Sequence, residues 1–482
     1  MIAGWWLALL LLVAGQTSPV SGRAGPANRP VAAAAPQGQL ALAVEAEVER
    51  LANERSFWPH FQPLEIPLAV YDGERTLLFR HPAPPEGFAR VGDDGGGAAS
   101  PGAFAFTGRH PAVTSNTSAD LGGTVTATLR ADGQLDGKSA TDLAAVALHE
   151  SFHVFQRQHH AGWAGNEGDL FLYPVDDARL LALRRLESSA LRRALAAGEA
   201  ARAAGWARLA LGFRRERFAA MEPAFPAYER LSELNEGLAT YVQTLAAGAT
   251  TVDIPEGDFP PVKVRDRIYA VGPALAFLLD RFSPGWQAAL QADDSQSLDG
   301  MLEAALGRAP ADGTPDGESE ALPSFAADEI AAIERTAAQD VAAVNVARTA
   351  RRKEFDGKAG WRVVVQAAAD APLWPQGFDP LNVERVDGGV VHARFLELGN
   401  DSGRLQMLDE QAVDLDAFTE GVGPHPIFNG IRRVTVAGLA KPVLDSKDGE
   451  VSLHAPGFTA TFHHARAETT GTTVLVTPEP AR

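Results

Sequence analysis

Two histidines and a glutamate stand together at residues 149–153, where the sequence reads H-E-S-F-H. On a helix, residues four positions apart share one face, with Cβ atoms roughly 5–6 Å apart. The imidazoles of His149 and His153 can therefore bind one Zn²⁺ at about 2.0–2.1 Å each. Glu150 points to a different side of the helix, where its carboxylate can take a proton from a water molecule. The spacing predicts a hydrolytic zinc site with Glu150 as the general base.

A catalytic zinc site needs a third protein ligand, and a segment much later in the chain offers one. The sequence contains no cysteine, so this ligand has to be a histidine or a carboxylate. Residues 234–241 read L-N-E-G-L-A-T-Y, with the small residues Gly237 and Ala239 allowing close approach of another helix. We therefore expect Glu236 to be the third ligand. The alternative is an amphipathic helix whose Glu233 and Glu236 face water, as charged residues usually do.

The H-E-x-x-H and N-E-G-L-A segments together resemble the gluzincin zinc metallopeptidases, with aminopeptidase N and the thermolysin-like peptidases as the nearest members. The resemblance implies that His149, His153 and Glu236 bind Zn²⁺ and that Glu150 is the catalytic base. A further segment, R-I-Y-A-V-G, is similar to the Y-x-x-G segment of the aminopeptidase N group, whose tyrosine hydrogen-bonds the oxyanion. Tyr269 is the residue expected in that role; the alternative is a buried aromatic side chain of the core.

The chain also departs from the family pattern in three places. Glu236 lies 83 positions beyond His153, which implies a helical insertion at roughly 160–225. Thr240 stands where thermolysin-type enzymes carry an acidic residue that supports a histidine ligand. The sequence therefore does not identify a residue that hydrogen-bonds the histidine ligands. The G-x-M-E-N segment that grips a free substrate amine is missing, so the resemblance does not imply aminopeptidase specificity.

The composition restricts the partners and the location of the protein. A net charge of −18 over 482 residues argues against nucleic acid or an anionic membrane surface as the main partner. Residues 1–22 contain a short apolar run followed by small residues, which predicts a cleaved export signal and a periplasmic or extracellular protein without stable membrane insertion. The alternative is a retained N-terminal anchor. Residues 23–40, rich in Ala, Pro and Gly, predict a disordered linker.

The hydrophobic patterns predict an α+β protein with two domains. Residues 41–355 are expected to form a mainly helical domain with a small N-terminal sheet, which the resemblance implies to be a thermolysin-like metallopeptidase domain, and residues 358–482 a β-sandwich-like accessory domain. Helices are expected at 41–55, 176–222, 226–248, 264–282, 285–292 and 326–352, and strands of the first sheet at 66–71, 76–81 and 124–129. Ser139 and Asp142 predict the capped start of the helix that carries the histidines. We expect His159 and His160, at its end, to lie on the surface.

The expected activity is hydrolysis of peptide bonds in a peptide or protein substrate. The strand at 124–129 is expected to form the sheet edge along which an extended peptide lies. One alternative is a non-catalytic zinc-site protein whose C-terminal β-domain binds a protein or surface partner. Another is a chance motif in a structural helix bundle, which would bind no metal. The sequence does not indicate the oligomeric state, the cleavage preference or the choice between endo- and exopeptidase.

Overall fold

The computed structural model describes residues 39–83, 85–91, 102–308, 323–378, 383–387, 389–392, 396–407, 412–418 and 430–479. The predicted export signal, and the predicted linker up to residue 38, lie outside these residues. The described residues up to Gly165 and from Arg179 to Arg335 form one compact unit, and Asn166–Ala178 with those from Thr336 onward form a second. Helices and sheets are both present, which confirms a mixed α+β protein. No helix among the described residues is apolar and long enough to cross a membrane.

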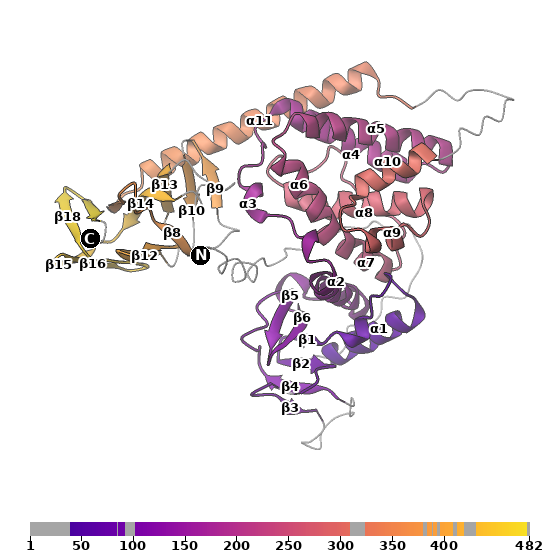
Figure 1. The fold of residues 1–482 in the computed structure, drawn as a ribbon, viewed down its shortest axis with the longest axis horizontal. Coiled ribbons are helices and arrows are strands. Elements are labelled where there is room, and N and C mark those ends of the chain that lie inside the picture. Colours follow the sequence, from indigo (N-terminus) through magenta and orange to yellow (C-terminus); the bar gives the residue numbers. More distant parts are fainter. Residues whose placement is uncertain are drawn as a thin grey trace. The chain divides into compact units, whose positions relative to one another are not determined.

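The first unit begins with a helix and a six-stranded sheet (Figure 1). These elements are α1 (Leu40–Glu54), β1 (Leu68–Tyr71), β2 (Arg75–Phe79), β3 (Ala89–Arg90), β4 (Phe104–Thr107), β5 (Thr117–Leu121) and β6 (Thr124–Arg130). The strand order is β3-β4-β2-β1-β6-β5, in which β1 and β6 are parallel and the other neighbours antiparallel. The prediction that the 124–129 strand forms the sheet edge is therefore wrong. A tight turn at Gly122 and Gly123, both with positive φ, folds β5 onto β6, so β5 is the edge.

Helix α2 (Ala140–His159) carries the two histidines and begins as the sequence predicts. The Asp142 N–H donates to Ser139 Oγ over 3.1 Å, and the Ser139 N–H donates back to the Asp142 carboxylate. From Leu143 to Gln156 nearly every residue of the helix is buried, because α2 packs against α1, β5, β6 and helix α7 (Leu238–Ala246). The two histidines therefore lie inside the unit.

The rest of the first unit is helical (Figure 1). The segments are α4 (Ala178–Ala196), α5 (Ala200–Ala219), α6 (Ala224–Ser232), the π-helical turn η5 (Glu233–Gly237), α7 (Leu238–Ala246), α8 (Val264–Phe282), α9 (Trp286–Ala292) and α10 (Leu298–Arg308). Short 3₁₀ turns are η2 (Pro63–Glu65), η3 (Gly133–Leu135) and η4 (Ala161–Trp163). Where the sequence predicts one helix at 226–248, α6, η5 and α7 follow one another, with the third expected ligand in the π-helical turn.

A cluster of buried charges joins five of these helical segments. We call it the buried charge cluster; its members are Glu187, Arg214, Arg217, Glu229, Glu233 and Arg267. Glu187 of α4 is bound by Arg214 and Arg217 of α5, at 3.0 and 2.7 Å, and by Arg267 of α8 at 2.8 Å. An uncompensated buried charge is strongly unfavourable, so these pairs favour one mutual arrangement of the helices.

The second unit contains two sheets that enclose one apolar core. The seven-stranded sheet has the order β18-β19-β7-β14-β13-β10-β9, and the six-stranded sheet β15-β16-β17-β12-β11-β8. The strands are β7 (Trp361–Gln366), β8 (Trp374–Phe378), β9 (Val383–Val386), β10 (Gly389–His392), β11 (Leu396–Asn400), β12 (Gly403–Met407), β13 (Ala412–Phe418), β14 (Ile431–Leu439), β15 (Val443–Lys447), β16 (Glu450–Ala455), β17 (Phe458–Phe462), β18 (Ala465–Thr470) and β19 (Thr473–Pro478). Both sheets contribute alternate apolar residues to the core, which is the arrangement of a sandwich.

Two helices accompany these strands, α3 (Glu167–Leu170) and α11 (Ala327–Asp356). The division between the units falls within α11, at residues 335 and 336, whereas the sequence analysis places the domain boundary near the end of that helix.

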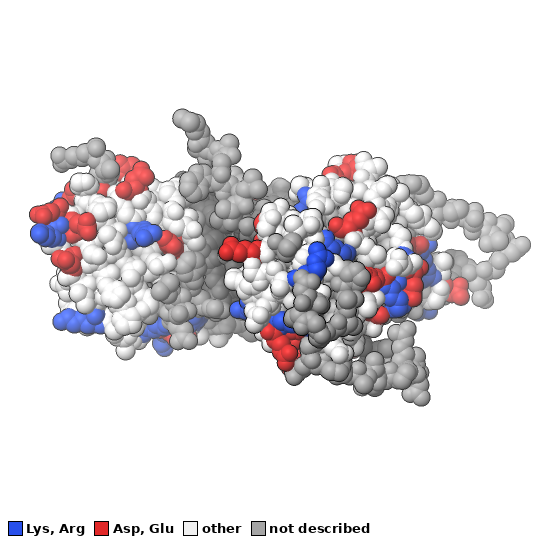
Figure 2. Space-filling view, turned by 90° about the horizontal axis from the view of Figure 1, so that it is seen from below, with Lys and Arg blue, Asp and Glu red and all other residues white. Residues whose placement is uncertain are grey.

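On the face seen in Figure 2, the described lysine and arginine side chains are interspersed with acidic ones and do not form a large basic patch.

Candidate metal centre

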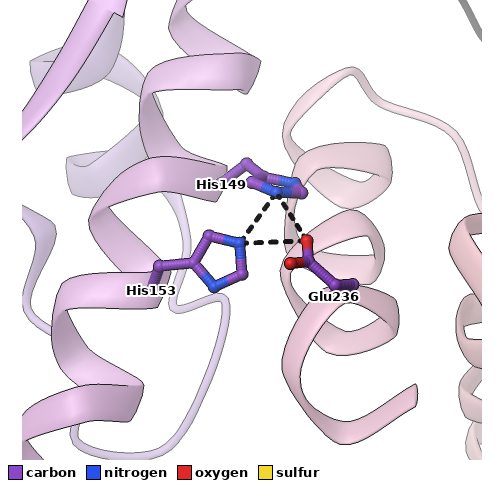
Figure 3. Close-up of side chains that lie close together, drawn as sticks. All are labelled: His149, His153 and Glu236. Atoms are coloured by element: carbon purple, nitrogen blue, oxygen red, sulfur yellow. Dashed lines mark hydrogen bonds and ion pairs between the residues drawn. The ribbon is translucent and has the colours of Figure 1, made fainter. Parts of the chain in front are cut away.

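The side chains of His149, His153 and Glu236 converge between helix α2 and the π-helical turn η5 (Figure 3). The Nε2 atoms of the two histidines are 3.1 Å apart. Glu236 Oε2 lies 3.3 Å from His153 Nε2 and 3.9 Å from His149 Nε2. Helix packing thus brings together the three residues that the sequence analysis names as ligands, although 83 positions separate the second from the third.

These distances fit the coordination sphere of a metal ion. Ligand atoms bound at about 2.0–2.1 Å in a tetrahedral arrangement lie about 3.3 Å from one another, and the observed separations of 3.1, 3.3 and 3.9 Å bracket that spacing. The side chains of His149, His153 and Glu236 are only 2%, 12% and 10% exposed. The cluster could hold a metal ion, and two imidazoles with one carboxylate are ligands that zinc accepts.

The protonation states of Glu236 and His149 suit a cation. Burial by itself would raise the pKa of Glu236, but the charges of His153 and Arg265 hold it well below its usual range. Burial lowers the pKa of His149 to about 3, and the charge of His153 acts in the same direction. Burial also lowers the pKa of His153, but the carboxylate of Glu236 outweighs this effect and raises it overall. The cluster therefore offers an ionised carboxylate and at least one neutral imidazole as donors.

Glu150 lies next to this cluster on α2 and is only 3% exposed. Burial raises the pKa of its carboxyl group to about 7, against the opposing charge of His153 and with the support of Glu236. Arg157, two turns further along the helix, also lowers this pKa. A carboxyl group with a pKa near neutrality can both accept and return a proton, which is what general acid–base chemistry requires.

The imidazole of His153 is held from its other side by Gln156, a residue absent from the sequence-based site. His153 Nδ1 lies 2.8 Å from Gln156 Oε1. Gln156 Nε2 in turn donates to the carbonyl oxygens of Leu234 and Asn235, over 2.8 and 3.0 Å. The signal available in the sequence was the spacing, because residues three apart on a helix lie within reach of one another.

Helix α8 contributes two more side chains to the centre. The ring of Tyr269, only 8% exposed, lies 6.5 Å from that of His149 and nearly parallel to it. Burial and the carboxylate of Glu236 raise the pKa of Tyr269 well above its ordinary value, so its hydroxyl remains a donor. Arg265, which the sequence analysis did not single out, donates to Glu236 Oε1 over 2.7 Å and to the Tyr269 hydroxyl over 3.3 Å. Its position one turn before Tyr269 was the available signal.

Two further polar residues near the centre have structural contacts. Thr240 Oγ1 donates to the backbone carbonyl of Glu236 over 2.8 Å, so it supports the helix and not a histidine ligand. The expectation that His160 lies on the surface is wrong, since only 4% of it is exposed. The chain turns at the end of α2, which stacks the ring of His160 on Trp163 at 3.9 Å and places Nδ1 2.6 Å from Asp294.

Models of known protein families do not match this chain, and neither a curated protein nor a solved structure is significantly similar to it. The assignment of chemistry to this centre therefore depends on the side chains themselves. The residues that carry it are two histidines on α2, a carboxylate on η5, a second carboxylate beside the first histidine, and two donors from α8.

Proposed function

We propose that the protein is an exported zinc-dependent peptidase that hydrolyses peptide bonds. The observation that carries the proposal is the convergence of His149, His153 and Glu236, whose ligand atoms lie 3.1, 3.3 and 3.9 Å apart. Glu150 follows His149 on the same helix, α2. The likeness of the H-E-x-x-H and N-E-G-L-A segments to gluzincin metallopeptidases supports the choice of reaction, and helical segments carry all of the proposed ligands.

His149, His153 and Glu236 would hold the zinc ion. When bound, zinc supplies Lewis acidity, which polarises a carbonyl group and lowers the pKa of a coordinated water from 15.7 to about 7. Glu150 receives the proton of the attacking water and afterwards returns it to the leaving amine. Its burial keeps bulk water from competing for that proton. Glu150 is thus the proposed acceptor for the proton that the attacking water releases.

Tyr269 and Arg265 act on the charge that develops at the substrate. As the peptide carbonyl becomes tetrahedral its oxygen gains negative charge, and the Tyr269 hydroxyl donates a hydrogen bond to that oxygen. Arg265 donates to both Tyr269 and Glu236, which keeps the hydroxyl and the carboxylate in fixed relation. Strand β5 is the last strand of the sheet and packs against α2, and its outer edge would offer backbone donors and acceptors to an extended peptide.

The test combines metal content with proteolysis by the full-length purified protein. We expect zinc near one equivalent, cleavage of an unstructured casein substrate, and loss of cleavage with a chelator. Glu150→Gln should retain zinc and lower the cleavage rate about 10²–10⁴-fold, the usual contribution of a general base. Glu303→Gln, in an exposed pair with Arg215, is the matched control and should cleave like the wild type.

Three outcomes would contradict parts of this proposal. Equal cleavage by Glu150→Gln would remove that residue from the reaction. Bound zinc without any turnover would favour the alternative, a zinc-site protein whose β-domain binds a partner. Absence of bound metal would leave a structural helix bundle.

A further inference from the structure

Gln156 connects the two chain segments that carry the proposed ligands. It lies one turn after His153 on α2 and is only 2% exposed. Its amide oxygen faces His153 Nδ1 at 2.8 Å, and its amide nitrogen faces the carbonyls of Leu234 and Asn235 at 2.8 and 3.0 Å. Those carbonyls belong to η5, the turn that also carries Glu236.

The chemistry of these groups fixes the orientation of the amide. Backbone carbonyl oxygens only accept hydrogen bonds, so the group that faces Leu234 and Asn235 has to be the NH₂ of Gln156. The oxygen of Gln156 then faces His153 and only accepts, so Nδ1 of His153 carries a proton. Nε2, which faces His149 and Glu236, is the nitrogen left to bind a cation.

The turn η5 is π-helical, and its Asn235 carbonyl accepts from the Leu238 N–H as well as from Gln156. A π-helical turn shifts the backbone hydrogen bonds from the i→i+4 pattern of the neighbouring α-helices, and such turns are frequent at functional sites. Buried carbonyls require partners, and the NH₂ of Gln156 satisfies two of them. The same amide thus fixes the ring of one ligand and the turn that presents another.

We propose that Gln156 is the positioning residue that couples His153 to the turn carrying Glu236, in place of an acidic residue hydrogen-bonded to a histidine ligand. This inference rests on the proposed metal centre and deepens it. No carboxylate from the position of Thr240 supports a histidine here, since Thr240 binds the backbone of its own helix. Outer-shell partners of this kind typically change metal affinity 10–100-fold when they are removed.

Two substitutions separate the two halves of the amide in the full-length protein. Gln156→Met removes both the acceptor and the donors, and should weaken zinc affinity about 10–100-fold. Gln156→Glu keeps an acceptor for His153 but loses the donors to η5, so zinc affinity should fall less than in Gln156→Met but stay below that of the wild type, and the metal-free protein should unfold at lower urea. Gln158→Met, at an exposed position on the same helix, is the control and should change neither property.

Zinc affinity is measured by competition with a chromogenic chelator, and Co²⁺ absorption reports the geometry of the bound ion independently of turnover. A changed Co²⁺ spectrum in Gln156→Met and a smaller change in Gln156→Glu would support the proposal. Unchanged affinity and spectrum in Gln156→Met, with only a loss of stability, would overturn it and leave the proposed peptidase intact. A wild-type protein that binds no zinc would overturn both, whereas zinc binding without proteolysis would overturn only the proposed function.

Discussion

Gly237 and Gly272 bring the backbones of η5 and α8 into direct contact. A Cβ atom on Gly237 would lie 2.7 Å from the Gly272 Cα atom, and one on Gly272 would lie 2.5 Å from the Gly237 Cα atom. No side chain can separate the two segments at this crossing. The contact allows Arg265 and Tyr269, on α8, to reach Glu236, the residue that precedes Gly237.

We predict that Gly237→Ala or Gly272→Ala disturbs the metal centre as well as the fold. The added methyl group forces the backbones apart, at a cost of about 1–3 kcal/mol for overpacking, and displaces Glu236 from the histidines. Zinc affinity should fall about 10–100-fold, as when the support of a metal ligand is lost. Urea unfolding and chelator competition measure the two effects.

The control for the glycine pair is Gly212→Ala in α5, where an added Cβ would meet nothing within 4 Å. Alanine is the better helix former, so this variant should gain up to about 1 kcal/mol of stability and keep its zinc affinity. If Gly237→Ala bound zinc as tightly as Gly212→Ala, the close crossing would not be what positions Glu236.

Tyr269→Phe should separate binding from catalysis. The substitution removes the hydroxyl but keeps the ring that lies parallel to His149. If the hydroxyl stabilises the oxyanion, kcat falls about 10²–10³-fold while KM and zinc content stay near their wild-type values. Steady-state cleavage of a fluorogenic peptide measures kcat and KM. The matched control is Tyr71→Phe, because the Tyr71 hydroxyl donates to the carbonyl of Gly73 and not to a residue of the metal centre. Equal kcat in both variants would assign Tyr269 to packing.

The ligand helix could be predicted from sequence because its determinants are local. Ser139 and Asp142 form the expected capping box, and α8 has the bounds expected from its apolar period. The spacing of the two histidines follows from helical geometry. What these signals share is that each depends on neighbours within one or two turns of the same helix.

The remainder depended on contacts between distant segments. Nothing in the sequence around Glu233 marks the π-helical turn. Two of its carbonyls accept hydrogen bonds from Gln156, a residue of another helix. From the sequence, Arg265 is expected to be an exposed residue at the start of a helix. Only the packing of α8 on η5 brings it to Glu236. The same holds for β5, which the sequence analysis missed and which displaced the expected edge strand.

The buried charge cluster was equally hidden, since its arginines and glutamates follow the pattern of solvated helix faces. Each of its pairs joins a residue of one helix to a residue of another, and Arg214 reaches Glu233, one turn before Glu236, at 2.5 Å. The insertion between the second and third ligands is therefore tied to the ligand-bearing turn by charge. This connection gives α4 and α5 a physical role in holding the centre.

Glu187→Gln should reveal that role through the pH dependence of stability. Burial by itself raises the pKa of Glu187, but the guanidinium groups of Arg217, Arg267 and Arg214 outweigh it and hold the pKa well below its ordinary value. The carboxylate therefore stabilises the fold above the unfolded-state pKa of about 4.3, and this stabilisation is lost as the pH falls toward the folded-state pKa. At pH 7 the variant should lose about 3–5 kcal/mol, because three buried guanidinium groups lose their shared partner.

The difference from the wild type should shrink in urea unfolding at pH 3, whereas Glu216→Gln, in an exposed pair with Arg179, should differ by no more than about 1 kcal/mol at either pH. A loss that is small at pH 7, or that stays constant on acidification, would mean that the charge on Glu187 does not hold these helices together.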